Sequence, residues 1–535
     1  MGQLCAKCAQ LLYDLVLSVK TFSSNLVQDV KECLAQICDC SCLKRTKFET
    51  RQLYKPTLQC HEEVIAQEFL QHIERGFEIS PLGEASLSVL KTLAFSENSD
   101  LQKSASLFYL KISQHLPKEH VIQVDLLEPI LELLESNDVM IQCNSCACIM
   151  ILAVSDTNRE AITSAGGIVP LLTLSKSYDS KVQQYAVGAI FNLTQSEWVQ
   201  QILCRQGALP VLTLLLESPD SEVQYYSCAA LSNMATNSQH HAVMLQTGDR
   251  FLLRMLIFLL SSSVDKVSNQ ACVCLRNLVT SECVQTGLIA MGILLHLLPL
   301  LDLNNMEVQQ NSIILLRMLS QHPANQDALV CHEVLQSVGK LLITRKSDPV
   351  IIGHAACFIK NLTYSKSIRR VVESRCVEGL LQAIHGVEHL DEEALHCVTS
   401  CLDELVKHEG GSVSILELMD EQLLSCLVRL AGQVEKTEPS FQAAVLIKHL
   451  IQHGEVVQLL KSHINKIQQY LMKYLTHQET RFQQLGISTL CLLQKDTEFL
   501  SAFSGSQLKK HLDQICQQTE ELQELLRMAV GNMDT

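Results

Sequence analysis

The sequence predicts an all-α protein in which similar helical units stack into an α-solenoid. The chain has 535 residues, which is more than one compact core holds, since such cores stop growing near ~250–300 residues. Hydrophobic residues make up 47% of the chain but aromatic residues only 5%, and Gly and Pro number 21 and 11. An internal repeat of nearly constant length then favours a stacked array over a set of unrelated domains.

The repeat is clearest in the centre of the chain, where Val182 opens a phrase that ends in Asn192-Leu193. Ten similar phrases open at Leu101, Ile141, Val182, Val223, Val267, Val308, Ile351, Ala394, Pro439 and Phe482. These anchors are separated by 40, 41, 41, 44, 41, 43, 43, 45 and 43 residues. A period of ~40–47 residues is that of armadillo and HEAT repeats, so we expect about ten armadillo-type units in a right-handed superhelix. A large generic helical bundle, the alternative, does not require equal spacing.

Within each unit the sequence predicts where helices begin and end. A glycine and then a proline precede the anchor, as in Gly166 with Pro170 and Gly207 with Pro210. Glycine ends one helix, and proline is tolerated in the first turn of the next. The long helix that opens at the anchor places offsets 0, 4, 7, 8 and 11 on one apolar face, which only stacking on neighbouring units can bury.

Offsets 9 and 10 of the long helix lie between these positions and should point out along one side of the superhelix. Offset 10 reads Asn192, Asn233, Asn277, Met318 and Asn361 in five central units. An asparagine amide both donates and accepts, so this column can pair with the main chain of an extended peptide. The alternative is that each asparagine only caps or solvates its helix.

Offset 9 reads Arg276, Arg317 and Lys360 in three consecutive units, and then Asp403. Three cations at one helical offset predict a positive stripe beside the asparagines, and arginine presents donors suited to carboxylates and phosphates. We therefore expect protein partners that bind as extended peptides, with acidic or phosphorylated segments as a refinement. Three ordinary solvated cations are the alternative.

Residues 1 to about 75 lack the repeat phrase and suggest membrane anchoring. Gly2 is a candidate for N-myristoylation, and Cys5 and Cys8 beside it are candidates for palmitoylation. One myristoyl chain binds membranes only marginally, so a second signal is needed. A second cysteine cluster, Cys38, Cys40 and Cys42, is the alternative acylation site, and the basic residues after it would favour an anionic leaflet.

The same cysteines allow two other interpretations. Cys5 and Cys8 could bind zinc with two of Cys33, Cys38, Cys40 and Cys42, although their spacing departs from usual zinc motifs. They could also be unmodified thiols. The start of the chain is not a convincing signal peptide, so we expect a cytosolic protein whose 23 cysteines stay reduced. Many of them occupy apolar helical positions, where cysteine acts as a small hydrophobe.

Composition and motifs exclude several function classes. The formal net charge is −15, from 42 basic and 57 acidic residues, which argues against generic nucleic-acid binding. No run of 18 apolar residues predicts a membrane-spanning helix. The sequence carries no Walker A, G-x-G-x-x-G, H-E-x-x-H or G-x-S-x-G motif. We therefore expect no catalytic residues, resident metal or cofactor, and a protein that is not an enzyme.

The repeats, the glycine at position 2 and the Cys42-Leu43-Lys44 block together resemble the fungal vacuolar armadillo-repeat family. The likeness is strongest in Leu127 to Ile130, Val223 to Asn233 and Leu275 to Leu278, and it covers roughly residues 80 to 495. The resemblance implies an acylated adaptor on the cytosolic face of the vacuolar or lysosomal membrane, with a cytoplasmic pool. It implies roles in organelle inheritance, membrane contact sites and autophagy. It also implies that Arg276 and Arg317 bind partner peptides, with Lys360 where another arginine is expected.

Two other armadillo classes are the alternatives. An importin-like cargo receptor pairs ladder asparagines with repeated tryptophans, whereas Trp198 is the only tryptophan here. A catenin-like signalling or adhesion adaptor also has a basic groove, and the acylatable N-terminus is the feature that distinguishes the vacuolar class from it.

We expect a membrane-anchoring segment at 1–75, the solenoid at 76–500 and a capping helix at 501–535. A heptad-like stripe from Leu508 to Leu526 makes a coiled coil the alternative to the cap, and we expect a monomer.

Overall fold

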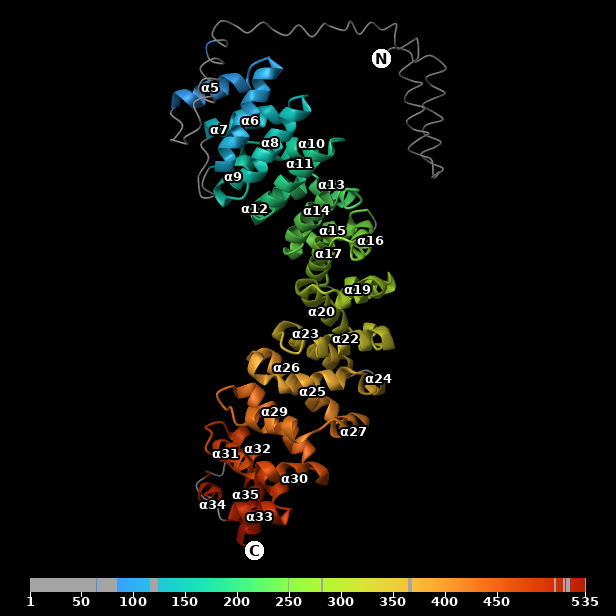
Figure 1. Ribbon diagram of the computed structural model, residues 1–535, viewed down its shortest axis with the longest axis vertical. Helices are drawn as coiled ribbons and strands as arrows, with labels where there is room; N and C mark the ends of the chain where they lie inside the picture. Colours follow the sequence, from blue (N-terminus) through green and yellow to red (C-terminus); the bar gives the residue numbers. More distant parts are fainter. Residues whose placement is uncertain are drawn as a thin grey trace. The chain divides into compact units, whose positions relative to one another are not determined.

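The computed structural model describes residues 64, 84–115, 124–248, 250–280, 282–363, 368–504, 507–512, 515 and 520–534. The chain divides into two compact units, residues 1–106 and 107–535. The elements within these described ranges are helices, with no strand among them. The prediction of an all-α repeat fold is therefore confirmed, and Figure 1 shows the helices following one another in chain order through the second unit.

A complete repeat unit contains three helices in chain order: a short first helix, a second helix and a long third helix. The long third helices are α6 (Ser99–His115), α8 (Val139–Leu152), α11 (Ser180–Leu193), α14 (Ser221–Met234), α17 (Asp265–Leu278), α20 (Met306–Ser320), α23 (Pro349–Thr363), α26 (Glu392–Val406), α29 (Thr437–Leu450) and α32 (Thr480–Leu493). The second helices are α5 (Glu84–Ala94), α7 (Val124–Leu134), α10 (Ile168–Leu174), α13 (Ala208–Leu215), α16 (Phe251–Leu259), α19 (Ile293–Asp302), α22 (His332–Thr344), α25 (Cys376–His385), α28 (Glu421–Ala431) and α31 (Ile464–Leu475). The first helices are α9 (Asp156–Ser164), α12 (Glu197–Arg205), α15 (Ser238–Gln246), α18 (Glu282–Ala290), α21 (Pro323–Leu329), α24 (Ile368–Val372), α27 (Glu409–Glu417), α30 (Gly454–Leu460) and α33 (Thr497–Ser504). Two short 3₁₀ turns, Val387–His389 and Lys461–His463, complete the repeats.

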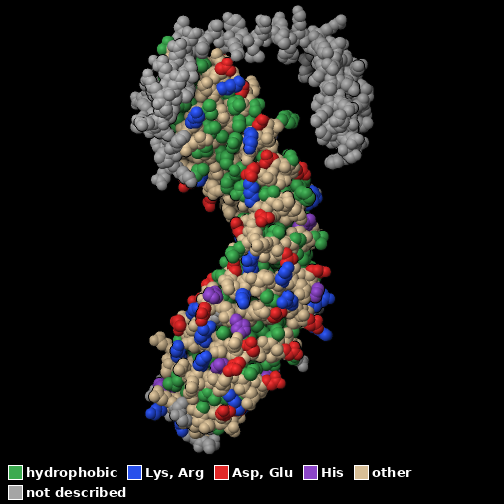
Figure 2. All heavy atoms as spheres, in the orientation of Figure 1, with side chains coloured by type: hydrophobic (Ala, Val, Ile, Leu, Met, Phe, Trp, Pro, Cys, Tyr) green, Lys and Arg blue, Asp and Glu red, His purple; other side chains and the backbone are tan. Residues whose placement is uncertain are grey.

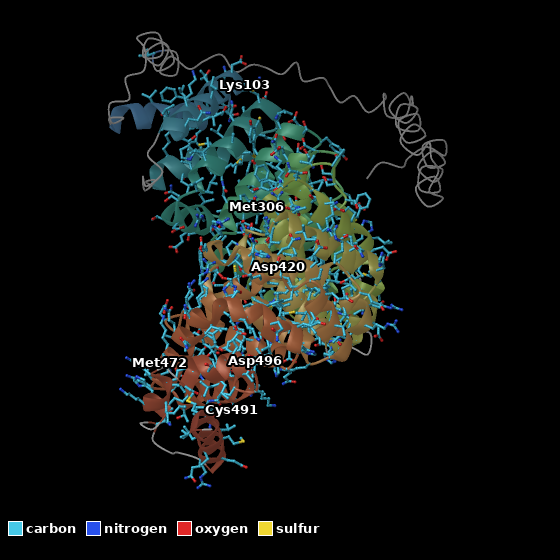
Figure 3. All side chains as sticks on the ribbon, turned by 60° about the horizontal axis from the view of Figure 1, so that its bottom comes forward. Lys103, Met306, Asp420, Met472, Cys491 and Asp496 are labelled. Carbon is cyan, nitrogen blue, oxygen red and sulfur yellow. The ribbon has the colours of Figure 1, made fainter. Side chains whose placement is uncertain are left out.

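Each of the ten anchors is the third residue of its long helix. In most of these helices a capping side chain lies three residues before the anchor, although Val264, Lys436 and Glu479 at that position make no capping hydrogen bond. Asp138, Asp179 and Asp220 each accept hydrogen bonds from two backbone N–H groups of the first turn of α8, α11 and α14. An aspartate at this position satisfies N–H groups that have no partner within the helix, and its charge complements the positive end of the helix dipole. Asp420, labelled in Figure 3, also caps a helix, the second helix α28, and accepts from one backbone N–H group, that of Leu423.

Glycines mark the boundary between first and second helices in four successive units. Gly166, Gly207, Gly248 and Gly292 all have positive φ angles, between 65° and 86°. A residue with a Cβ atom is strained in this left-handed region, so glycine is the residue suited to reversing the chain here. The predicted glycine breaks are confirmed at Gly166 and Gly207, and Pro170 and Pro210 lie in the first turns of α10 and α13.

The core of the second unit lies between consecutive repeats. Each long helix from α8 to α29 contacts the long helix of the next unit, and the second helices form a parallel series of contacts from α19 to α31. In α11 the five predicted apolar offsets, Val182, Ala186, Ala189, Ile190 and Leu193, are all 0% exposed. The long helices therefore form one continuous layer, and we call the side of this layer that carries offsets 3, 6, 9 and 10 the inner surface.

The C-terminal stripe is divided between two helices, α34 (Leu508–Leu512) and α35 (Glu520–Asp534). Helix α35 contacts α32, α33 and α34, and it buries Leu526, Ala529 and Met533. Its apolar side thus covers the last long helix of the array. Across the described ranges no single helix has the length and hydropathy to cross a bilayer, and α18 with α19, bent by 85°, passes that test only as a pair.

Candidate functional site

The sequence-predicted peptide site lies on the long helices α11, α14, α17, α20 and α23. We call Asn192, Asn233, Asn277 and Asn361 the amide ladder, and Arg276, Arg317 and Lys360 the cation stripe. All seven side chains are half-buried. The three cations stand on consecutive helices, α17, α20 and α23, each of which contacts the next.

The amide ladder reaches back to the preceding repeat. Asn192 donates through Nδ2 to the Met150 carbonyl at 2.7 Å, and Asn277 donates to the Ser232 carbonyl at 3.1 Å. The amides of Asn233 and Asn361 donate to the hydroxyl groups of Thr194 and Ser320, at 3.0 and 2.9 Å.

Each ladder amide therefore uses one donor to join two repeats. Among the described residues its Oδ1 atom has no protein partner, so an acceptor remains on the inner surface. Met318, at the same offset in α20, is half-buried and supplies no amide to the ladder.

The cation stripe reaches forward to the next repeat. Arg276 donates through Nη1 to Oδ1 of Asn311 at 2.7 Å, and Arg317 donates through Nη1 to Nδ1 of His354 at 2.9 Å. The Lys360 ammonium donates to the hydroxyl of Ser400 at 2.7 Å. In all three cases the partner is a neutral side chain on the following long helix.

The His354 imidazole is kept neutral by its surroundings. Burial lowers its pKa, and the positive charge of Arg317 lowers it further. Because a guanidinium can only donate, the neutral Nδ1 atom is the acceptor. The contact thus orients the guanidinium without neutralising its charge.

The stripe ends at α26, where offset 9 is Asp403. This carboxylate is buried and accepts from Nδ1 of His449 at 2.8 Å, and the Lys407 ammonium lies 3.0 Å from it. Burial opposes ionisation of Asp403, but the hydrogen bonds from His449 and Lys407 prevail and lower its pKa. Beyond Lys360 the inner surface therefore carries an internally paired charge.

Two groups on the inner surface were not singled out in the sequence. In the N-terminal half, Phe191 packs against Tyr225 and Tyr226, with ring centroids 6.4 and 5.9 Å away, and Lys266 lies 5.1 Å from the centre of the Tyr225 ring. Phe191 stands at offset 9, where the next units carry Ser232 and Arg276. The second group is the thiol pair Cys357 and Cys397, on α23 and α26. Comparing offsets 3, 6 and 9 across neighbouring repeats would have found both groups.

Other charged and hollow surfaces differ from the stripe. Figure 2 shows Lys and Arg side chains interspersed with Asp and Glu over the face it draws. A cavity of about 920 Å³ lies between the short helices α24 and α27, lined by residues such as Arg369, Glu373 and Glu417. It is formed by first helices and by the chain leading into α25, so it is separate from the layer of long helices that carries the stripe.

Several predicted residues lie outside the described ranges. These are Gly2, Cys5 and Cys8, and the alternative acylation residues Cys38, Cys40 and Cys42. Within the described parts of the chain, no three His, Cys, Asp or Glu side chains are grouped to hold a metal ion. The zinc alternative involves cysteines outside those parts.

Comparison with known proteins adds the family context. The model of the armadillo/beta-catenin-like repeat matches residues 155–195 and 199–236. Vacuolar protein 8 of Schizosaccharomyces pombe is 33% identical over 513 residues, which cover 87% of this chain and 91% of that protein.

Other relatives match over shorter stretches. Vacuolar protein 8 of Komagataella pastoris is 38% identical over 128 residues, covering 24% of this chain and 22% of the relative. The chain spans about a fifth of the length of most curated relatives that it matches.

A solved structure supports the fold alone. The crystal structure of an engineered protein superposes with a TM-score of 0.52 and 20% sequence identity, covering 84% of this chain and 99% of the engineered one. At this identity the likeness carries no information about partners. It agrees with the repeat architecture seen in the helices themselves.

Proposed function

The chain belongs to the Vacuolar protein 8 family of armadillo-repeat proteins, and from that premise we propose that it is a non-enzymatic scaffold that binds acidic, extended peptide segments of partner proteins. The binding surface is the inner side of α17, α20 and α23. The cation stripe selects acidic side chains, and the Oδ1 atoms of the amide ladder beside it accept hydrogen bonds from the N–H groups of the peptide main chain.

One observation carries this proposal: the three stripe cations are held by neutral partners. Among the described residues none of the three lies within ion-pair distance of a carboxylate. Some cations elsewhere in the described ranges are paired with carboxylates, as Arg429 is with Glu388 and Arg481 with Glu438, whereas Arg345 and Lys466 also have neutral partners. A cation held in place by Asn311, His354 or Ser400 keeps its charge for a carboxylate supplied by a partner. Side chains ordered before binding lose less conformational entropy when the partner arrives.

One carboxylate, that of Glu307, is connected to Arg276 through two amides. Asn311 donates to Asn269 at 2.8 Å, and Asn269 donates to Glu307 at 2.7 Å. This chain of hydrogen bonds fixes the Asn311 amide so that its Oδ1 atom faces Arg276. The carboxylate thus organises the site and leaves the guanidinium unpaired.

We extend the proposal to cellular location. The relatives are named for the vacuole, so we place this chain on the cytosolic face of a vacuolar or lysosomal membrane, with a cytoplasmic pool. Acylation at Gly2 with Cys5 and Cys8 would supply the two lipid signals that stable anchoring requires. Membrane tethering, organelle inheritance and autophagy are the processes that such an anchored adaptor would serve, as a monomer.

Peptide binding to the purified chain tests the proposal. The probe is a fluorescent peptide rich in Glu and Asp, compared with a version in which Gln and Asn replace every acidic residue. The double variant R276E/R317E should bind the acidic peptide about 30-fold more weakly or worse, because truncating one partner of a desolvated charge pair costs ~2–5 kcal/mol.

The matched control is R205E/R254E, which reverses two exposed arginines on α12 and α16. It makes the same change in net charge away from the stripe and should bind as the wild type does. Unchanged helical content in both variants shows that the fold is retained. If R276E/R317E binds as tightly as the control, or if the neutral peptide binds as well as the acidic one, the stripe is not the recognition site.

A further inference from the structure

The long helices α23 and α26 bring two cysteine side chains into contact on the inner surface. The Sγ atoms of Cys357 and Cys397 lie 2.9 Å apart, and both thiols are free. Cys357 is at offset 6 of one repeat and Cys397 at offset 3 of the next, the offset that also supplies His354 and Asn311. The two side chains are half-buried, so small solutes can reach them.

The charges around this pair favour a reactive thiolate on one side. The hydrogen bond between the two thiols lowers the pKa of Cys357 to about 7, against the opposing effect of burial. The positive charges of Arg317 and Lys360 act in the same direction, and Glu393 acts against them. The hydrogen bond to Cys357 raises the pKa of Cys397, as does burial, so Cys397 is the member that keeps its proton.

Two other cysteines, Cys272 on a long helix and Cys376 on a second helix, have the opposite surroundings. Burial raises the pKa of Cys272 and of Cys376 to about 12, and both are fully buried. Such thiols are inert, because the thiolate is the nucleophile and it needs access to the oxidant. The contact between Cys357 and Cys397 is therefore a distinct chemical site in a chain rich in cysteine.

We propose that Cys357 and Cys397 are a peroxide-sensitive dithiol that closes into a disulfide between neighbouring repeats. The proposal goes beyond the scaffold function and does not depend on peptide binding. The Cys357 thiolate attacks one oxygen of hydrogen peroxide, the O–O bond breaks, and hydroxide leaves to become water. The sulfur of Cys397 then attacks the Cys357 sulfenic acid, the S–OH bond breaks, and the thiol proton leaves with the hydroxyl as a second water.

The step balances as two thiols and one peroxide giving one disulfide and two waters. A disulfide needs its sulfur atoms at about 2.05 Å, so the two atoms must close by less than 1 Å from their present positions. The product would join α23 to α26 beside Arg317 and Lys360, whose partners His354 and Ser400 lie on the same two helices. A dithiol reductant would reverse it.

Mass spectrometry of the full chain tests the proposal. Reduced protein is treated with a small excess of hydrogen peroxide, blocked with N-ethylmaleimide and digested without reductant. We expect a linked peptide pair joining the Cys357 segment to the Cys397 segment, absent from C357S and C397S and restored to two free thiols by dithiothreitol. C283S removes an exposed cysteine on α18 and should leave the linked pair unchanged.

Dimedone, which traps sulfenic acids, tests the order of attack. In C397S, dimedone should label Cys357, because the sulfenic acid persists without its resolving thiol. In C357S, dimedone should leave Cys397 unlabelled. Labelling of Cys397 in C357S would overturn the assignment of Cys357 as the attacking thiol.

A measurement on the wild type keeps the test independent of the variants' folding. Limiting N-ethylmaleimide should modify Cys357 before the buried Cys376. If peroxide leaves both Cys357 and Cys397 fully alkylatable in the folded wild type, the dithiol is not a peroxide site and the proposal fails.

Discussion

The guanidinium of Arg317 in one repeat donates a hydrogen bond to the imidazole of His354 in the next, with 2.9 Å between Nη1 and Nδ1. The two residues are 37 positions apart and belong to adjacent long helices, α20 and α23. The contact holds a cation on the inner surface by means of a neutral base. It also connects the protonation state of a histidine to the packing of two repeats.

The first prediction concerns this histidine and pH. Burial and Arg317 lower the pKa of His354 below its ordinary value of 6.5, so the unfolded chain binds a proton that the folded chain does not. Stability should therefore fall as pH decreases through 6.5 towards the folded-state pKa, and it should be full above 6.5. H354N keeps an acceptor for Arg317 and removes the titration, so its urea midpoint should fall less between pH 7.5 and 5.5. H385N, at an exposed histidine of α25, serves as the control; equal pH slopes in H354N and wild type would contradict the coupling.

The second prediction concerns the recurring aspartate caps. Asp179 accepts from the backbone N–H groups of Lys181 and Val182, both at 3.0 Å. D179A should lower the free energy of unfolding by about 1 kcal/mol, and D179S, which keeps a capping oxygen, should lower it by less. Urea unfolding followed by circular dichroism measures both. D327A removes an exposed aspartate inside α21 and should change little; an equal loss in D327A and D179A would show that charge, and not capping, is responsible.

The third prediction concerns the amide ladder as a connection between repeats. Asn277 donates to the carbonyl of Ser232, 45 positions earlier in the chain. Removing a half-buried hydrogen bond costs roughly 0.5–1.5 kcal/mol, so N277A should lower the unfolding free energy by that amount. Q195A, at an exposed glutamine after α11, is the control. A stability of N277A equal to that of wild type would mean that the ladder contributes nothing to repeat packing.

The fourth prediction concerns anchoring by the N-terminal segment. G2A should abolish incorporation of an alkyne-tagged myristate, and G2A or C5S/C8S should move the chain from membranes to the soluble fraction, because one acyl chain binds only marginally. Cell fractionation with click labelling measures both effects. If C5S/C8S has no effect but replacing Cys38, Cys40 and Cys42 by serine does, the second cluster is the acylation site. If none of these changes alters fractionation, the anchoring proposal fails.

The repeat and its register could be predicted closely, because both depend on local periodicity. Val182, Val223 and Val267 lie in the first turn of helices that bury the expected offsets, since residues three and four apart share a helix face whatever the helix packs against. The aspartates at offset −3 were equally readable as capping residues, and the sequence prediction passed over them. The cation stripe and the amide ladder could be proposed because they repeat at one offset.

The partners of those side chains could not be read from the sequence. Asn277 donates a hydrogen bond to Ser232 of the preceding repeat, and Arg276 donates one to Asn311 of the following repeat. Cys357 contacts Cys397 of the following repeat. These pairs lie between 35 and 45 positions apart, and the side chains that touch depend on how far each repeat is rotated and shifted on its neighbour.

The sequence by itself therefore determined the helices, their length and the face that each one buries. The tertiary structure decided which charges stay unpaired and which thiols meet. The physical reason is that helix formation and burial follow from contacts within one turn and one unit, whereas the inner surface is made by side chains of two units. Its chemistry depends on packing geometry that no single repeat contains.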